Sequence, residues 1–426
     1  MSKESPPLPS SSSFHPVPPP LPDIDVSEDQ LPQDPIPTAP IYPSSDMSST
    51  SLPIKNYKPS KTGIKFICPY CMREIYTGDL RYFCKKCKKS YSEDDVKKNV
   101  EMRRIVKKQV FCCNENITFQ LLCPNCIIIA SSQQPKVEIE NIRKLQPEYF
   151  AIRNDFRVCM AGYTSSGKSQ YITQLMDYIA KYQIPGIDAT SFLDNETQRN
   201  RDLIRKDLFK EFVATKPGYL EPLFFEIRQG RRSHFSVFYD IAGEDFEKDN
   251  DTLATRCIWN SKNVLLMVDP STLPKVQNHE RVKLLKEKDK ASKGDTKDPL
   301  NKYYNFVKRN HPKGVRFFRD VNLAIVFPKM DLFYDDDDFP AILKTESVYI
   351  NKNGRYDIDE ANKVSEAMKG WIKEKDGGII SDALKPYPNV RLFGISSGSD
   401  DPNKRDKTNR LLDPYLWLLL QNGILQ

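Results

Sequence analysis

Short apolar runs recur along the last two thirds of the chain, and each is bounded by polar or turn-forming residues. They are rich in β-branched and aromatic side chains, and they predict buried strands over residues 156–161, 222–228, 234–239, 264–268, 321–327 and 390–395. Residues 229–233 join the second and third runs as a hairpin turn. Apolar residues at helical spacing follow the first run. Strands alternating with helices predict a doubly wound α/β domain with a mainly parallel sheet.

A different pattern precedes this domain. Strand-like pieces with large apolar side chains at Ile67, Ile75, Tyr82 and Phe83 surround closely spaced cysteines. The segment Ser92–Val110 carries valine or isoleucine at positions 96, 100, 105 and 110, with charged residues between them, which predicts an amphipathic helix. This region predicts a small cysteine module over residues 61–135, ahead of the α/β domain at 150–426.

The first 60 residues have few large apolar side chains and hold 15 of the 32 prolines. Such a segment cannot bury a core, so we expect a disordered Pro/Ser-rich tail. Pro16–Pro22 could dock into an aromatic groove of a partner, but a solvated tail is the favoured interpretation.

Charge is unevenly distributed over the 426 residues. The net charge of +7 divides into −4 for residues 1–60, +7 for 61–150 and +4 for 151–426. Ten lysines and arginines between residues 85 and 108 suggest nucleic-acid contact, a solvated surface or a protein-docking face. Few aromatic residues are interleaved with them, which favours a solvated surface or a docking face over nucleic-acid contact. Eight zinc-bound thiolates would also contribute about −4 next to these cations.

No apolar run approaches the ~20 residues that cross a bilayer, and the amino terminus lacks the apolar part of a secretory signal. The expectation is therefore an intracellular, cytoplasmic protein with reduced thiols and no membrane span.

Eight of the ten cysteines fall within 59 residues, as three Cys-x-x-Cys turns and one adjacent pair. They are Cys68, Cys71, Cys84, Cys87, Cys112, Cys113, Cys123 and Cys126. Each Cys-x-x-Cys turn directs two thiolates to one side, and two pairs complete a tetrahedral zinc site. The sequence therefore predicts two four-cysteine zinc sites. With four protein ligands, each would be structural rather than catalytic.

The pairing of these half-sites is open. The first two turns, twelve residues apart, look like a zinc ribbon, while an interleaved arrangement is an alternative. Cys112 and Cys113 can reach one metal only if the backbone bends between them. A disulfide framework and a redox pair fit the repeated turns and the absent signal peptide less well.

The segment Gly162–Ser169 matches the Walker A pattern between a predicted strand and a predicted helix. Gly162 and Gly167 allow the loop backbone to turn its amides toward phosphate groups. Lys168 would neutralise the β- and γ-phosphates, and the Ser169 hydroxyl would bind Mg²⁺. The loop residues Ser165, Ser166 and Gln170 complete the predicted phosphate contacts.

Three later strand ends carry polar residues. Asp240 lies at the end of the hairpin's second strand, and Gly243 follows three residues later. In nucleotide switches such an aspartate holds Mg²⁺ and the glycine amide senses the γ-phosphate. Two further strands lead into Lys329-Met-Asp331 and into Ser396-Ser397.

In this order the elements resemble the P-loop GTPases of the translation-factor and Ras-like class. The resemblance covers about Phe156–Leu420 and implies a G domain. It implies that Asp331 accepts from guanine N1–H and the exocyclic amine, that the Lys329 stem packs on the base, and that Ser396 and Ser397 provide the last base contact. Pro328 departs from the asparagine or threonine of the family's motif.

The sequence Asp240–Asp245 (DIAGED), the Lys-x-Asp variant and residues 411–419 (LLDPYLWLL) further look like the prokaryotic double-GTPase family. This similarity implies a partner protein, which could be another GTPase, in a biological-conflict system.

Candidates for hydrolysis are Lys168, Glu244 and Thr190. Glu244 follows the Asp-x-x-Gly motif and could orient water, although a role in favouring the next helix dipole is the alternative. Thr190, with Ser191 and Thr197 near it, could ligate Mg²⁺ or could cap a helix at 201–213. Arg231 and Arg232 lie at a hairpin tip, and we expect slow hydrolysis without a partner.

Two charged segments are predicted to be solvated. A polar insertion at 271–297 contains seven lysines and reads as a mobile helix or a docking site. The run Asp335–Asp338 lacks the glycine and distal glutamate of a calcium loop and reads as surface charge.

The sequence therefore predicts a Mg²⁺-dependent GTP-binding and hydrolysing switch with a zinc module. The alternatives are a nucleotide-stabilised zinc scaffold for protein interaction, and a nucleic-acid-binding zinc protein that the G domain gates.

Overall fold

The computed structural model describes residues 61–98, 103–104, 109–132, 138–145, 156–181, 184, 187, 189–192, 222–247, 253–287, 298–346, 355–397 and 408–425. All of them belong to one compact unit, Pro40–Gln426. The predicted tail with its Pro16–Pro22 segment, Thr197, the predicted helix 201–213 and the end of the polar insertion lie outside the described residues.

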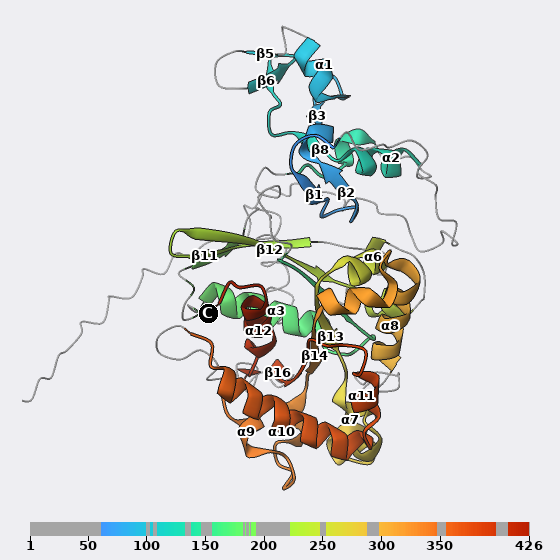
Figure 1. The fold of residues 1–426 in the computed structure, drawn as a ribbon, viewed down its shortest axis with the longest axis vertical. Helices are drawn as coiled ribbons and strands as arrows, with labels where there is room; N and C mark the ends of the chain where they lie inside the picture. Colours follow the sequence, from blue (N-terminus) through green and yellow to red (C-terminus); the bar gives the residue numbers. More distant parts are fainter. Residues whose placement is uncertain are drawn as a thin grey trace, which may run out of the picture. The chain divides into compact units, whose positions relative to one another are not determined.

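A seven-stranded sheet forms the centre of the α/β domain (Figure 1). Its strands, in spatial order, are β10 (Ala189–Phe192), β11 (Pro222–Gln229), β12 (Arg232–Asp240), β9 (Phe156–Gly162), β13 (Asn263–Met267), β14 (Asn322–Phe327) and β15 (Val390–Gly394). The five strands from β12 to β15 are parallel, whereas β10 and β11 are antiparallel to their neighbours. Six of these strands lie within two residues of their predicted ranges, which confirms the α/β prediction. Strand β10 was not predicted.

Burial on both faces explains the continuous apolar runs of the parallel strands. All seven residues of β9 are buried. On one face, Phe156 and Phe238 pack against Tyr415, with ring centroids 6.3 and 5.7 Å from it. On the other face, Cys159 Sγ lies 3.7 Å from Cys257 Sγ. The sheet is therefore the middle layer of three.

Helices cover the two faces of the sheet (Figure 1). Helices α3 (Lys168–Lys181) and α12 (Asp413–Gln421) lie on one face, and α6 (Leu253–Asn260) and α8 (Asp298–Asn310) on the other. Further helices are α5 (Gly243–Glu247), α7 (Glu280–Glu287), α9 (Ala341–Lys344), α10 (Ile358–Asp376) and α11 (Ile379–Ala383). Short β16 (Ser396–Ser397) pairs with β17 (Thr408–Asn409). The loops that follow β9, β12, β13 and β14 share one edge of the sheet, where α/β folds place their ligands.

The cysteine module contains short strands and two helices. These are β1 (Lys65–Ile67), β2 (Glu74–Tyr76), β3 (Arg81–Cys84), β4 (Lys89–Tyr91), α1 (Glu93–Lys98), β5 (Arg103–Arg104), β6 (Gln109–Cys112), β7 (Glu115–Asn116), β8 (Leu121–Leu122) and α2 (Pro124–Ser132). The strand-like pieces predicted around Ile67, Ile75 and Tyr82 are confirmed as β1, β2 and β3.

The predicted helix over Ser92–Val110 is wrong beyond Lys98. Helix α1 ends there, and Arg103–Arg104 pairs with Gln109–Val110 as an antiparallel ladder. Both Val96 and Val110 are buried beside Cys84, so the chain has to turn back toward this cluster. The helical spacing of the valines was outweighed by the need to bring Cys112 to the other thiols.

Among the described helices, none combines the length and the apolar character that a membrane crossing requires.

Candidate functional site

The eight cysteines of the module form two separate clusters. Cys68, Cys71, Cys123 and Cys126 make the first cluster, and Cys84, Cys87, Cys112 and Cys113 make the second. In sequence order, the first and fourth cysteine pairs therefore share one cluster, and the second and third pairs share the other. This nested arrangement is neither of the two that the sequence suggested, so the zinc-ribbon pairing of the first two turns was wrong.

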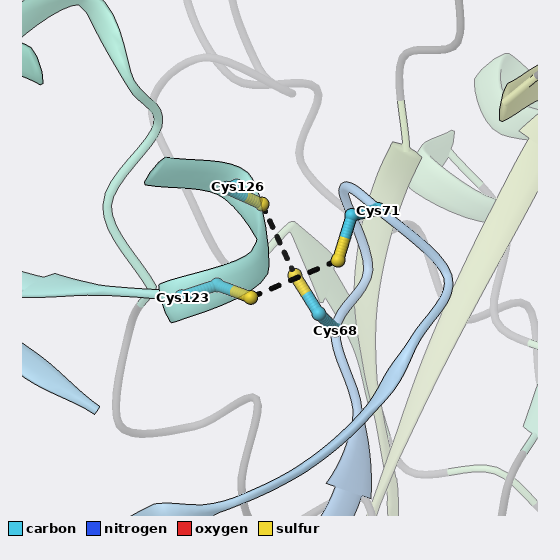
Figure 2. Close-up of side chains that lie close together, drawn as sticks. All are labelled: Cys68, Cys71, Cys123 and Cys126. Atoms are coloured by element: carbon cyan, nitrogen blue, oxygen red, sulfur yellow. Dashed lines mark hydrogen bonds between the residues drawn. The ribbon is translucent and has the colours of Figure 1, made fainter. Parts of the chain in front are cut away.

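Figure 2 shows the four thiols of the first cluster converging from the β1–β2 turn and from the start of α2. The Sγ atoms of Cys68 and Cys126 lie 3.7 Å apart, as do those of Cys71 and Cys123. Sulfur atoms around a zinc ion with bonds of about 2.3 Å lie about 3.8 Å apart at the corners of a tetrahedron. The donor set and spacing of the first cluster therefore fit zinc.

The second cluster has the same spacing with more exposure. Cys112 Sγ lies 3.7 Å from both Cys87 Sγ and Cys113 Sγ. Cys113 and Asn114 adopt left-handed φ values of 51° and 67°, which supply the bend that adjacent ligands need. Cys84 is buried, whereas Cys113 is exposed. This cluster also fits zinc.

The Tyr91 hydroxyl lies 3.3 Å from Cys87 Sγ and 3.4 Å from Cys112 Sγ. Its hydrogen bond lowers the pKa of Cys87 to about 6. A metal needs the thiolate form, and hydrogen bonds from outside the ligand set hold ligands in place. The Tyr91 hydroxyl would therefore hold Cys87 and Cys112 in place around a metal, a contact that the sequence did not predict.

Residues next to the first cluster bond to the central sheet. The Arg157 guanidinium on β9 donates to the carbonyl of Ile67 at 3.0 Å, and the Tyr239 hydroxyl on β12 donates to that of Pro69 at 3.2 Å. Both side chains are buried. Tyr239 immediately precedes Asp240, so this contact reaches the strand end that carries the predicted Mg²⁺ ligand.

The segment from β9 to α3 forms the predicted glycine-rich loop. Gly162 and Gly167 have φ values of 152° and 89°. A Cβ at Gly162 would lie 2.6 Å from the carbonyl oxygen of Met267, so only glycine fits there. The loop then passes directly into α3, so the amino-terminal end of this helix lies at the loop, where helices commonly bind anions.

Lys168 is buried and folds back over this loop. Its ammonium donates to the carbonyls of Gly162 and Tyr163, both at 2.8 Å. Burial lowers the pKa of Lys168 to about 8, although the nearby negative charges of Asp240 and Glu247 act to raise it. A bound phosphate would offer this cation a better partner than two carbonyls.

Ser169 and Asp240 meet as predicted. The Ser169 hydroxyl donates to Asp240 Oδ2 at 3.2 Å. Hydroxyl and carboxylate oxygens are ligands of the kind that Mg²⁺ prefers. Gly243 lies against the loop, because a Cβ there would be 2.3 Å from the backbone nitrogen of Thr164.

The acidic contact to the loop comes from Glu247, which the sequence reasoning missed. Glu247 Oε1 accepts from the Thr164 backbone N–H at 2.8 Å, and Lys302 on α8 donates to the Glu247 carbonyl. Glu244 is exposed in the first turn of α5.

Thr190 does not reach this end of the sheet. Its backbone lies in β10 opposite Ile227, which in turn pairs with His234. Residues 234 to 240 of β12 span about 20 Å. The structure therefore separates Thr190 from Asp240 by about that length.

The loop after β14 lies beside the phosphate-loop candidate. Lys329, at a left-handed φ of 60°, donates to the Ser165 carbonyl and to Asp269 Oδ2, each at 2.7 Å. The Asp269 side chain has 0% exposure, and sequence reasoning gave this strand-ending residue no role. Pro328 lies over Gly167, because a Cβ added at Gly167 would be 3.3 Å from the proline ring.

Asp331 is held by the next strand end. The Ser396 hydroxyl donates to Asp331 Oδ1 at 2.9 Å. Burial raises the pKa of Asp331, and this hydrogen bond counters the rise. Ser397 follows in β16, paired with Thr408.

No protein-family model matches the chain, and no curated protein matches it either.

Proposed function

We propose that the α/β domain binds a guanine nucleotide with Mg²⁺ and hydrolyses GTP slowly, as the resemblance to P-loop GTPases implies. The observation that carries this proposal is Lys329. Its single ammonium joins the Ser165 carbonyl of the glycine-rich loop to the loop of Asp331. One ligand lying along both loops would place its phosphates on the first and its base on the second.

The chemistry of each end supports the assignment. Lys168 and the α3 amides would neutralise the phosphates, and Ser169 with Asp240 would hold Mg²⁺. The bound metal would neutralise charge on the phosphates. At the other end, an ionised Asp331 accepts from two guanine N–H groups, a pattern that adenine does not present.

The chain is expected to hydrolyse GTP slowly by itself and faster with a partner protein. With Glu244 exposed, we expect intrinsic turnover on the order of 10⁻⁴ s⁻¹. A partner that adds a cation would raise this rate. The resemblance to the double-GTPase family extends the proposal to a second GTPase or an associated protein as that partner.

The cysteine module is proposed to be a zinc-stabilised docking face rather than a nucleic-acid site. Two of its lysines have local acidic partners, Lys88 with Glu140 and Lys97 with Glu93. Phe119 is 59% exposed and is therefore available for a protein contact.

Replacing Asp331 with asparagine tests the base assignment. Asparagine can donate to the C2 carbonyl of xanthine, whereas it cannot accept from both guanine donors. We expect Asp331→Asn to lose GDP affinity about 10- to 100-fold and to gain XDP binding, since a bidentate base contact is worth about 1–3 kcal/mol. The measurement is a fluorescence titration with both nucleotides.

The matched control is Asp337→Asn, an exposed aspartate of the same segment, which should keep the wild-type preference. If Asp331→Asn kept the wild-type ratio of GDP to XDP affinity, Asp331 would not read the base.

A further inference from the structure

The segment after β13 packs against the loop that carries Asp331. Arg281 on α7 donates through Nη1 to the backbone carbonyls of Asp331 and Leu332, both at 3.2 Å. Its Nη2 forms an ion pair with Asp335. One guanidinium thus spans both ends of the turn at residues 330–335.

His279 adds a second contact from the same segment. Its Nε2 lies 3.0 Å from Asp336 Oδ1, and its ring packs edge-on against Phe333 at 5.4 Å between centroids. Together with Lys375, which pairs with Asp338, these contacts give partners to three residues of the four-aspartate run. The interpretation of this run as simple surface charge was therefore incomplete.

The loop needs an external brace. Pro328 provides neither a side-chain donor nor a backbone N–H at the position where the resembling family has asparagine or threonine. Lys329 is held in a left-handed conformation, which is strained for a residue other than glycine. Asp269, which follows β13, fixes the Lys329 ammonium, and Arg281 fixes the carbonyls of Asp331 and Leu332.

We propose that Arg281 is a positioning residue for base recognition, replacing from α7 the brace that Pro328 lacks. This inference rests on the proposed guanine-nucleotide function. Arg281 does not touch the base. By holding the Asp331 and Leu332 carbonyls, it fixes the direction of the Asp331 carboxylate that accepts from guanine.

The charges around Asp331 agree with this role. Burial raises the pKa of Asp331, while the Ser396 hydrogen bond and the positive charges of Arg281 and Lys329 oppose the rise. Arg281 therefore also helps to keep the carboxylate ionised, the form that can accept from both guanine donors.

The test compares GDP with IDP, which lacks the exocyclic amine of guanine. A correctly oriented Asp331 carboxylate accepts a hydrogen bond from that amine, so the wild-type chain should bind GDP more tightly than IDP. In Arg281→Ala we expect the GDP-to-IDP affinity ratio to fall about tenfold, mostly through weaker GDP binding. Arg281→Lys keeps one donor and the charge, so its ratio should be intermediate and its fold secure.

Lys283→Ala is the matched control, because Lys283 lies on the same helix and is exposed. Its affinity ratio should equal that of the wild type. Calorimetric titrations with both diphosphates, together with thermal unfolding, give all the readouts.

The outcomes separate two failures. A wild-type chain that binds neither diphosphate would remove the proposed function and this inference with it. A wild-type chain that prefers GDP, with an unchanged ratio in Arg281→Ala and Arg281→Lys, would overturn the inference alone. Equal losses for GDP and IDP with a lowered unfolding temperature would show a merely structural arginine.

Discussion

The cysteine module and the α/β domain are stabilised in different ways. The module has two small apolar clusters with four buried residues each, and Cys84 belongs to one of these clusters. Other apolar residues of the module, such as Phe66 and Ile75, belong to the core of the central sheet. In the α/β domain, the strands β9 and β13 are buried along their whole length between layers of helices. Because these small clusters bury few apolar residues, we expect the module to need zinc in order to fold. The α/β domain supplies most of the residues of the core that it shares with the first cysteine cluster.

The two cysteine clusters differ in burial and in what they pack against. The first has three buried cysteines and bonds to the central sheet through Arg157 and Tyr239. The second has one buried cysteine and packs against Val96, Val110 and Ile117. Loss of the first metal should therefore release the Ile67 and Pro69 carbonyls from Arg157 and Tyr239, whereas loss of the second should act within the module alone.

Metal removal gives the largest expected difference between the two regions. Structural zinc contributes about 10–16 kcal/mol to small metal-dependent folds. A strong chelator should therefore unfold the module while β9, β13 and β14 stay ordered. Hydrogen exchange should show fast exchange at β1–β4 and β8 but continued protection of those three strands. Protection of β1–β4 that survived complete zinc removal would contradict the comparison.

Single cysteine substitutions sharpen the contrast between the clusters. Cys123→Ser removes a buried ligand, so we expect loss of about one zinc per chain and a large drop in unfolding temperature, several kcal/mol in free energy. Cys113→Ser changes an exposed ligand that water can replace, so its effect should be smaller. Zinc content and thermal unfolding measure both.

Cys257→Ala provides the control, because this buried cysteine lies in α6 outside both clusters and should leave two zinc ions bound. Equal effects of Cys123→Ser and Cys113→Ser would remove the proposed difference between the clusters.

A smaller effect should appear in the pH dependence of the α/β domain. The pKa of Lys168 is lowered from 10.5 to about 8 by burial, so the folded chain loses this proton before the unfolded chain does. This group therefore makes the nucleotide-free protein more stable as pH rises from about 8 to 10.5. Phosphate binding needs the charged form, so nucleotide affinity should be flat below pH 8 and fall above it.

The fall can reach about tenfold per pH unit, or 1.4 kcal/mol. Titrations between pH 7 and 9 measure it. Lys168→Arg, whose guanidinium does not titrate there, should show no slope whatever its own affinity. A wild-type affinity that stayed flat to pH 9 would show that Lys168 does not titrate in this range.

Features encoded by neighbouring residues were predictable. Six strands of the sheet and the glycine-rich loop Gly162–Ser169 follow from local periodicity and spacing. The same holds for the eight cysteines that form the two clusters, taken as a set.

Features that depend on distant pairing were not predictable. The nested cysteine clusters, the bonds from Asp269 to Lys329 and from Arg281 to Asp331, and the contact of Glu247 with Thr164 join segments far apart in sequence. The helical spacing at Ser92–Val110 gave a wrong prediction, because the chain turns back there to bring Cys112 and Cys113 to the second cysteine cluster. A strand-ending acid such as Asp269 was a usable signal, since two other strand ends carry site residues.

Calorimetry of the zinc-loaded full chain with Mg²⁺ and GDP or ADP, on wild type and Lys168→Ala, tests guanine-nucleotide binding itself. We predict that GDP binds at least about tenfold more tightly than ADP, and that Lys168→Ala loses this binding with its zinc content intact. Equal affinity for GDP and ADP, or no GDP binding by the wild-type chain, would rule out the proposed guanine-nucleotide site.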